Sequence, residues 1–110
     1  ADGLEGDLID VIPITSRTME DYLLILVKHQ TDQKLYLIEV QTMDVLAPIP
    51  IDQKSPRSNI TKFAYHEEAG LMVFAYDNLE LCVIPFHLDI FLDELKQKNK
   101  KTIKCVNATD

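Results

Sequence analysis

The chain has 110 residues, of which 46% are apolar and 26% are charged, an ordinary composition for one globular domain with a single core. No apolar run approaches the roughly 20 residues that a membrane-spanning helix requires. The net charge is −7 and unevenly distributed: residues 96–110 hold five lysines against one aspartate, a local balance of +4, so residues 1–95 carry −11. This acidic body excludes a nucleic-acid binder, because phosphate contacts need a broad basic face.

The first part of the chain predicts a short edge strand and a hairpin. After an acidic N-terminal segment, residues 1–7, which we expect to be mobile, residues 8–14 predict an edge strand whose ladder Pro13 interrupts. Residues 22–29 are the most apolar run and predict a central strand buried on both faces. Residues 34–41 alternate with period two and return antiparallel to it, which completes the hairpin.

A strand that contains prolines follows the hairpin. Apolar side chains occupy its alternate positions: Val45, Ala47, Ile49 and Ile51. Because prolines stand between them and cannot donate to a ladder, this segment has to be an edge strand or an extended segment. The polar loop that follows it, up to Ser58, is the longest in the chain and a natural contact site.

The second half predicts three strands that lead into a helix. Residues 60–66 alternate with period two, residues 71–76 are apolar on both faces as expected of a central strand, and residues 79–86 follow a tight turn. Residues 88–101 change to the helical period, with an apolar stripe made by Leu88, Phe91, Leu92 and Leu95. Asp89 is the capping-type residue nearest the start of this helix, so we expect it to be the N-cap.

These elements predict an α+β domain over residues 8–101, with residues 102–110 as a C-terminal tail. Its strands are expected to form a small, mainly antiparallel sheet or a partly open barrel of five to seven strands. The C-terminal amphipathic helix closes this sheet or barrel by packing across one face or one open end.

The order of elements resembles the pleckstrin-homology and phosphotyrosine-binding superfold, in which a C-terminal helix closes a small antiparallel barrel. The resemblance rests on residues 60–86 followed by residues 88–101 and includes no family motif, so it implies an architecture and no binding residues. The first hairpin loop, residues 30–33, lacks the basic character of inositide-binding members. Residues 63–86 also resemble strands of a propeller blade, so a β-propeller fragment is the alternative fold.

The two cysteines and two glycosylation triplets keep a second class of protein open. Cys82 in the last strand and Cys105 in the tail are too few for a disulfide scaffold, although they could pair with each other. Asn59 and Asn107 each begin an Asn-X-Thr triplet. A secreted glycoprotein domain with one disulfide is therefore the alternative, while the sequence favours a cytoplasmic protein with two thiols.

Enzyme signatures are absent from the sequence, which lacks the GxGxxG, P-loop, CxxC, HExxH and GxSxG motifs. His66 and His87 are expected at the same end of the sheet near several carboxylates, a conceivable metal or acid–base cluster, but metal-ligand spacing is missing. Cys82 lies inside a strand without a basic neighbour to stabilise a thiolate. We therefore expect no catalytic residue, no metal and no cofactor.

The predicted function is a non-catalytic protein–protein interaction module or a small subunit of a larger complex. Its partner is expected to be another protein rather than a nucleic acid or a membrane surface, because an unpaired strand edge is a template for adding a partner strand. A small enzyme that uses a histidine and carboxylate cluster is the remaining alternative. The candidate contact residues lie on the proline-containing strand, in its loop and on the lysine-rich end: Val45, Ala47, Ile49, Ile51, Lys54, Arg57, Lys98, Lys100 and Lys101.

Overall fold

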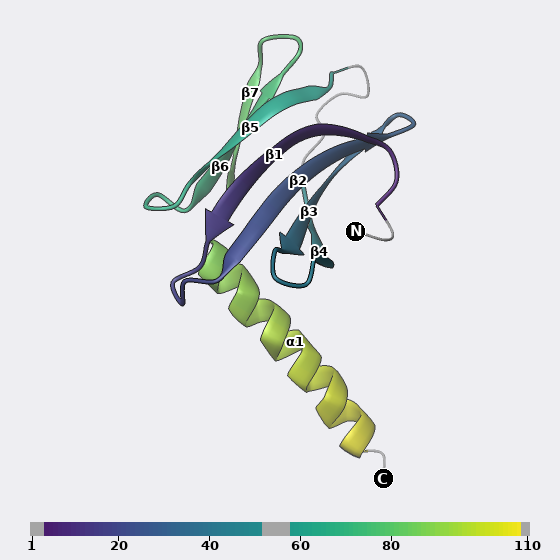
Figure 1. Ribbon diagram of the computed structural model, residues 1–110, viewed down its shortest axis with the longest axis vertical. Coiled ribbons are helices and arrows are strands. Elements are labelled where there is room, and N and C mark those ends of the chain that lie inside the picture. The colour runs from purple at the N-terminus through teal and green to yellow at the C-terminus, as the bar shows by residue number, and fades with distance from the viewer. Residues whose placement is uncertain (1–3, 52–57, 109–110) are drawn as a thin grey trace.

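The computed structural model describes the backbone of residues 4–51 and 58–108 and the side chains of residues 4–51 and 58–98. Within these residues, seven strands are followed by one C-terminal helix (Figure 1). The strands form two antiparallel sheets, a four-stranded sheet in the order β1-β2-β3-β4 and a three-stranded sheet in the order β5-β6-β7. The elements are β1 (Asp7–Thr15), β2 (Asp21–His29), β3 (Asp32–Glu39), β4 (Asp44–Ile49), β5 (Ile60–His66), β6 (Leu71–Tyr76), β7 (Leu81–Pro85) and α1 (Leu88–Ala108).

The strands form where period-two alternation predicts them. The bounds of β5 and β6 coincide with the predicted segments, and β2 and β3 form the predicted hairpin. One expectation was wrong: Pro13 does not interrupt β1, because the ladder pairs Pro13 with Leu23 and continues to Thr15. A proline is tolerated there because β1 is an edge strand, so the Pro13 nitrogen can lie on the unpaired side.

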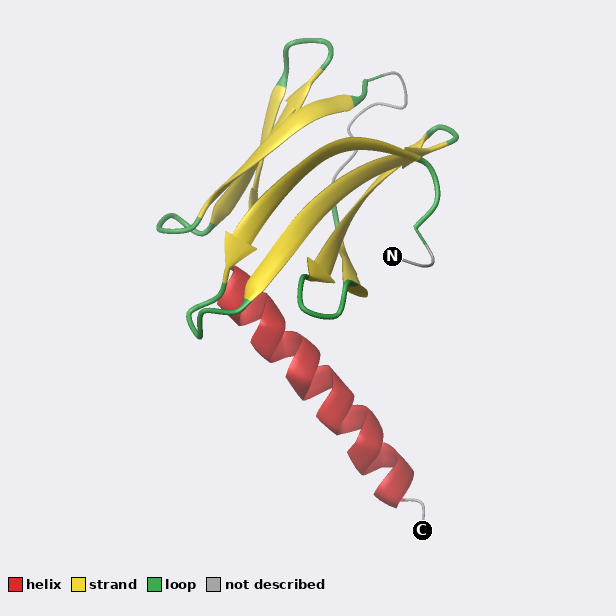
Figure 2. Ribbon diagram, in the orientation of Figure 1, coloured by secondary structure: helices red, strands yellow, loops and turns green. Residues whose placement is uncertain are grey.

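The two sheets enclose one apolar core between their inner faces (Figure 2). Leu24, Leu26 and Leu37 from the four-stranded sheet are fully buried, as is Met72 from the three-stranded sheet, where Phe74 is 1% exposed. Burial of each such side chain contributes about 1.5–3 kcal/mol. The described residues thus form a small α+β domain with two antiparallel sheets, where the sequence predicted one sheet or a partly open barrel; the described strands form no closed barrel.

Two polar side chains form hydrogen bonds between the sheets. These bonds take the place of a backbone ladder, since no described strand of one sheet pairs with a strand of the other. Gln33 on β3 is 4% exposed, and its amide bonds both backbone groups of Ile60: the Ile60 N–H donates to Gln33 Oε1 over 2.6 Å, and Gln33 Nε2 donates to the Ile60 carbonyl over 2.8 Å. Asp10 Oδ2 accepts from the Phe63 N–H over 3.1 Å. These three bonds hold β5 against the four-stranded sheet.

The first strands of the two sheets are neighbours. β1 and β5 lie side by side and run in the same direction (Figure 1). The bond from Phe63 to Asp10 closes this seam near its middle. Further along, the strands diverge and leave a groove of about 480 Å³ between residues 12–15 and residues 63–67.

The C-terminal helix α1 touches the sheets only through its first turns. Leu88 is 1% exposed, and Phe91 and Leu92 pack partly against the core. From there the helix projects away from both sheets, which gives the molecule a length of 53 Å (Figure 1). The expected packing of this helix across a sheet face or open end was wrong, since the lysine-rich segment after Leu95 has no apolar stripe to bury. Among the described helical residues, no stretch is long and apolar enough to cross a membrane.

The helix α1 starts at the predicted residue, but its N-cap and its C-terminal end differ from the sequence prediction. The helix begins at Leu88, so Asp89 lies in its first turn and is not the N-cap. Asp89 Oδ1 instead accepts from the Arg17 N–H over 2.9 Å, and the Leu88 N–H donates to the Tyr65 hydroxyl over 3.0 Å. The helix continues to Ala108 rather than ending at Lys101, because no glycine or proline follows residue 87.

The bonds between Gln33 and Ile60 lead to a stability prediction. Gln33→Ala should lower the free energy of unfolding by about 2–4 kcal/mol, because it leaves a buried N–H and a buried carbonyl of Ile60 without partners. Urea unfolding followed by circular dichroism measures this loss. Gln41→Ala, in the exposed turn after β3, is the matched control and should change the stability by less than about 0.5 kcal/mol. Equal small effects of the two substitutions would contradict the role of Gln33.

Candidate functional site

The outer face of the three-stranded sheet is mostly apolar, with Lys62 opposite Ala75 as a charged residue on it, and nothing among the described residues covers it. Leu81 and Val83 on β7 point to this face and are 66% and 57% exposed, whereas Cys82 between them points into the core. The register places Ala75 opposite Leu81 and Val73 opposite Val83. Monomeric proteins seldom expose contiguous apolar surface of this kind without a function for it.

The turn between β6 and β7 extends this apolar surface. Leu79 is 94% exposed and has a φ of 70°, a left-handed conformation that costs an ordinary residue about 1–2 kcal/mol. The turn is closed by bonds from the Leu79 N–H to the Tyr76 carbonyl and from the Tyr76 N–H to the Glu80 carbonyl. Asn78 Oδ1 also accepts from the Glu80 N–H. The turn therefore holds a large apolar side chain in solvent, beside the exposed side chains of β7.

The free edge of β7 has unpaired backbone groups. The Phe86 N–H donates to the Gly70 carbonyl over 2.9 Å, so Phe86 faces the β6 side. Because alternate residues of a strand direct their backbone groups to the same side, Cys82 and Ile84 also face β6. Leu81 and Val83 consequently direct both their N–H and carbonyl groups to the free edge, where no described strand pairs with them.

The other free edge that the sequence singled out, β4, is blocked by proline. The ladder pairs Tyr36 with Pro48, and a proline cannot donate to it, so the Pro48 nitrogen lies on the unpaired side. Pro50 follows two residues later. Prolines on an edge are a common protection against the addition of further strands. The prediction that this segment is an edge strand is confirmed. On β7 the corresponding proline, Pro85, is the last residue of the strand.

The predicted contact residues are not gathered on one surface. Ile49 is 4% exposed and belongs to the core, Ile51 packs partly against the core, and Val45 and Ala47 are half-buried. Lys98 is exposed on α1. Two groups lie outside what the structure describes, namely Lys54 and Arg57 as whole residues and the side chains of Lys100 and Lys101.

Carboxylates stand at both ends of the three-stranded sheet. Asp77 and Glu80 are exposed in the turn between β6 and β7, and Glu67 and Glu68 are exposed in the turn between β5 and β6. Against these four acidic side chains, residues 58–87 contain one lysine and no arginine. The apolar face therefore has an acidic rim, which attracts basic groups.

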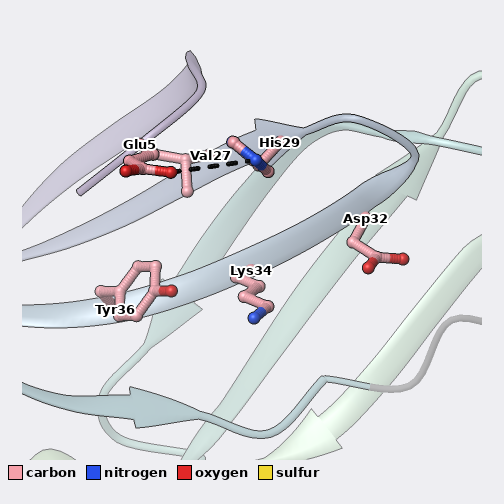
Figure 3. A pocket seen from close by; sticks show the side chains of 6 residues that line it. All are labelled: Glu5, Val27, His29, Asp32, Lys34 and Tyr36. Atoms are coloured by element: carbon pink, nitrogen blue, oxygen red, sulfur yellow. Dashed lines mark ion pairs between the residues drawn. The ribbon is translucent and has the colours of Figure 1, made fainter. Parts of the chain in front are cut away.

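A small recess beside β2 and β3 is lined mainly by polar side chains (Figure 3). It measures about 170 Å³, and its lining residues include Glu5, His29, Asp32 and Lys34. His29 Nε2 and Glu5 Oε2 lie 3.9 Å apart, while Asp32 and Lys34 stand away from this pair (Figure 3). Both members of the pair are largely exposed, so the interaction is weak.

The histidines and the buried cysteine do not combine into a reactive group in the described part of the chain. His66 and His87 do lie at the same end of the sheet, where both adjoin Gly70, as the sequence predicts. However, His66 Nδ1 accepts from the Ala69 N–H, and the described residues contain no cluster of three or more metal-ligating side chains. Cys82 is a buried free thiol, and the side chain of Cys105 lies outside the described residues.

The sequence did contain a signal for the apolar face that our prediction did not use. Leu79, Leu81 and Val83 alternate with polar or inward-facing residues, and the β6 segment is apolar on both faces. We took the apolar character of both faces as a sign of a central strand, which β6 is, and not as a sign of an uncovered face, whereas residues 71, 73 and 75 are only half-buried. Comparison with protein-family models, with curated proteins and with solved structures yields no match.

Tyr65 supports this sheet from its inner side by capping the helix. Its hydroxyl accepts the Leu88 N–H, and its ring packs edge-on against Phe86 at 5.7 Å between centroids. We predict that Tyr65→Phe lowers the free energy of unfolding by about 1–2 kcal/mol, because the first N–H of the helix loses its acceptor. Urea unfolding tests this, with Tyr36→Phe as the control, since the Tyr36 hydroxyl makes no hydrogen bond within the described residues. Equal stabilities of the two variants would refute the cap.

Two tyrosines make the stability sensitive to alkaline pH. Burial raises the pKa of Tyr65 above its ordinary value of 10.0; the bond from Leu88 acts in the opposite direction, and the charges of Glu67 and Asp89 add to the rise. Burial, followed by the charges of nearby carboxylates, also raises the pKa of Tyr22. In the folded state both phenols therefore keep their protons to higher pH than in the unfolded chain.

The sign of this effect gives the next prediction. The two phenols contribute a stability that is complete below pH ~10 and is lost as the pH rises through their folded-state pKa values. Urea unfolding between pH 9 and pH 11 should show a falling free energy, and the fall should be smaller for Tyr22→Phe and Tyr65→Phe. An identical slope in these variants and in the wild type would contradict the assignment.

Proposed function

We propose that the chain is a non-catalytic protein–protein interaction module or a small subunit of a larger complex. The observation that supports this best is the uncovered apolar face of the three-stranded sheet, with Leu79, Leu81 and Val83 as its most exposed members. Exposed apolar surface is unfavourable in water, and its burial against a partner contributes about 25 cal/mol for each Å². Covering this face with another protein removes that cost.

Two finer architectures agree with the observed sheets. A four-stranded and a three-stranded antiparallel sheet followed by a helix supports a pleckstrin-homology-like arrangement, although the projecting helix would have to move to close it. The side-by-side position of β1 and β5 supports the alternative of a propeller fragment, because in that fold consecutive meander sheets stack face to face around a common axis. In the second case, the outer face of β5–β7 would receive a further sheet.

The strand β4 and the lysine-rich end of α1 are a second proposed contact surface. Leu46 and Pro48 are exposed on β4, and Val45 and Ala47 are half-exposed, so side chains there are accessible. Pro48 removes one backbone donor from its free edge. The exposed Lys98 on α1 supports contact with an acidic partner surface.

The module should lose its partner when the apolar face becomes charged. Native cells expressing a tagged wild-type chain should yield a partner protein in stoichiometric amounts, and the double variant Leu81→Lys/Val83→Lys should retain at least about tenfold less, because lysines there would be buried without counter-charges. Quantitative mass spectrometry of the purified complexes measures this ratio.

The matched control carries the same substitutions on the other sheet. Leu8→Lys/Val11→Lys alters an exposed leucine and an exposed valine of β1 and should keep the partner at the wild-type level. Urea midpoints of both variants verify that each is folded. Equal loss in both double variants, or the absence of a stoichiometric partner, would refute the proposed surface. Hydrogen exchange of the complex then distinguishes protection of residues 45–51 from protection of residues 71–85.

A further inference from the structure

The two sheets have four edge strands, β1, β4, β5 and β7, and three of these are blocked. Pro13 on β1 and Pro48 on β4 remove an outward N–H from each strand. On β5, the Phe63 N–H is bonded to Asp10 and both backbone groups of Ile60 are bonded to Gln33. The free edge of β7 also ends in a proline, Pro85, but Leu81 and Val83 before it keep their outward N–H groups, so β7 offers two donors that no described residue engages.

That edge combines what an added strand requires. Leu81 and Val83 direct their N–H and carbonyl groups outward, and the same two residues expose apolar side chains on the outer face. Main-chain bonds supply affinity in strand addition, and alternate side chains supply selectivity. Over the five residues of β7 the edge spans about 17 Å, which matches a short strand.

We propose that β7 accepts a fourth strand from a partner protein, with apolar side chains at alternate positions and basic residues at each end. This inference rests on the proposed function, that of a protein-binding module, and specifies its partner. In the four-stranded sheet, β4 pairs with the outer edge of the third strand, β3. In the three-stranded sheet, no described strand pairs with the outer edge of the third strand, β7.

The charges select a basic partner over a second copy of this chain. Asp77 and Glu80 stand at the start of β7, and Glu67 and Glu68 stand in the turn beside its end, since Gly70 bonds Phe86 there. Two copies paired antiparallel through β7 would bring these two acidic groups together. Like charges across an interface oppose association, whereas lysine or arginine at both ends of a partner strand would be attracted.

A synthetic peptide tests the inference directly. The probe is Lys-Lys-Val-Thr-Val-Thr-Val-Lys-Lys with blocked ends and a fluorescent label, and binding to the full chain is followed by anisotropy. We expect saturable binding that weakens as salt rises, because the rim charges become screened. The same peptide with glutamate in place of each lysine should bind at least about tenfold more weakly. Absence of saturable binding up to ~1 mM would overturn the proposal.

Hydrogen exchange locates the peptide on the wild-type chain. The amides of Leu81 and Val83 should gain protection on binding, since their N–H groups face the free edge, while those of Cys82 and Ile84 already donate towards β6. The amides of β4 should not change. Protection confined to β4, or no change at Leu81 and Val83, would overturn strand addition at β7.

A proline variant supplies the second test. Val83→Pro removes one outward N–H and leaves the ladder between β6 and β7 intact, as Pro48 does in β4, so the peptide should bind about tenfold more weakly. Val83→Thr keeps the N–H and the branched side chain and should bind within about twofold of the wild type. Urea unfolding verifies that both variants are folded. Equal binding by both would contradict the backbone pairing.

Comparison of the lysine double variant with Val83→Pro distinguishes failure of strand addition from failure of the proposed protein-binding function. A native partner that is lost by Leu81→Lys/Val83→Lys but kept by Val83→Pro would leave the module standing and overturn strand addition. Sedimentation that shows a dimer abolished by Val83→Pro would assign the edge to a second copy and would also overturn the basic partner. Loss of the native partner in both variants, with protection of Leu81 and Val83, would support the inference.

Discussion

The arrangement of the two sheets depends on one side-chain amide. Gln33 offers Ile60 a donor and an acceptor, as a neighbouring strand would, and so replaces one rung of a ladder that the two sheets do not share. Ile60 is the first residue of β5, where the chain enters the second sheet. Because Gln33 is only 4% exposed, water cannot readily replace its bonds to Ile60. This contact, the bond from Phe63 to Asp10 and the shared core together hold β5 in position.

The same contact determines which edges remain open. Gln33 and Asp10 together bond the backbone of β5 that would otherwise face outward, and the divergence of β1 and β5 beyond Phe63 leaves a groove between two edges that are already engaged or blocked by proline. The polar bonds that join the sheets engage β5, whereas on β7, at the far edge of the second sheet, Leu81 and Val83 keep their outward N–H groups and Pro85 has none.

Much of the fold could be predicted from local patterns: period-two alternation gave the bounds of β5, and a short apolar run between two turns gave those of β6. Alternation reports how apolar each face is, but not what covers it, and for this reason the open outer face of β6 was missed. The helix cap was missed for a related reason: the acceptor for Leu88 is the Tyr65 hydroxyl, 23 residues earlier, whereas sequence patterns identify caps only among near neighbours such as Asp89. The edge character of β4 was legible because proline excludes a central position, yet the same prolines that identified it also weaken it as a template.

The apolar face promotes association with other proteins, whereas the acidic rim opposes association with acidic surfaces. Together they make the surface selective for basic partners. Leu79, Leu81 and Val83 would promote contact with any apolar surface, since the hydrophobic effect is not directional. The four carboxylates around them, within a chain of net charge −7, oppose contact between copies of this protein and with other acidic surfaces. A partner overcomes this repulsion only if it brings basic groups to both ends of the sheet while filling the apolar centre. The left-handed backbone of Leu79 also favours a bound state. It keeps a leucine side chain in solvent at a conformational cost of about 1–2 kcal/mol, and burial of that side chain in a complex would offset this cost.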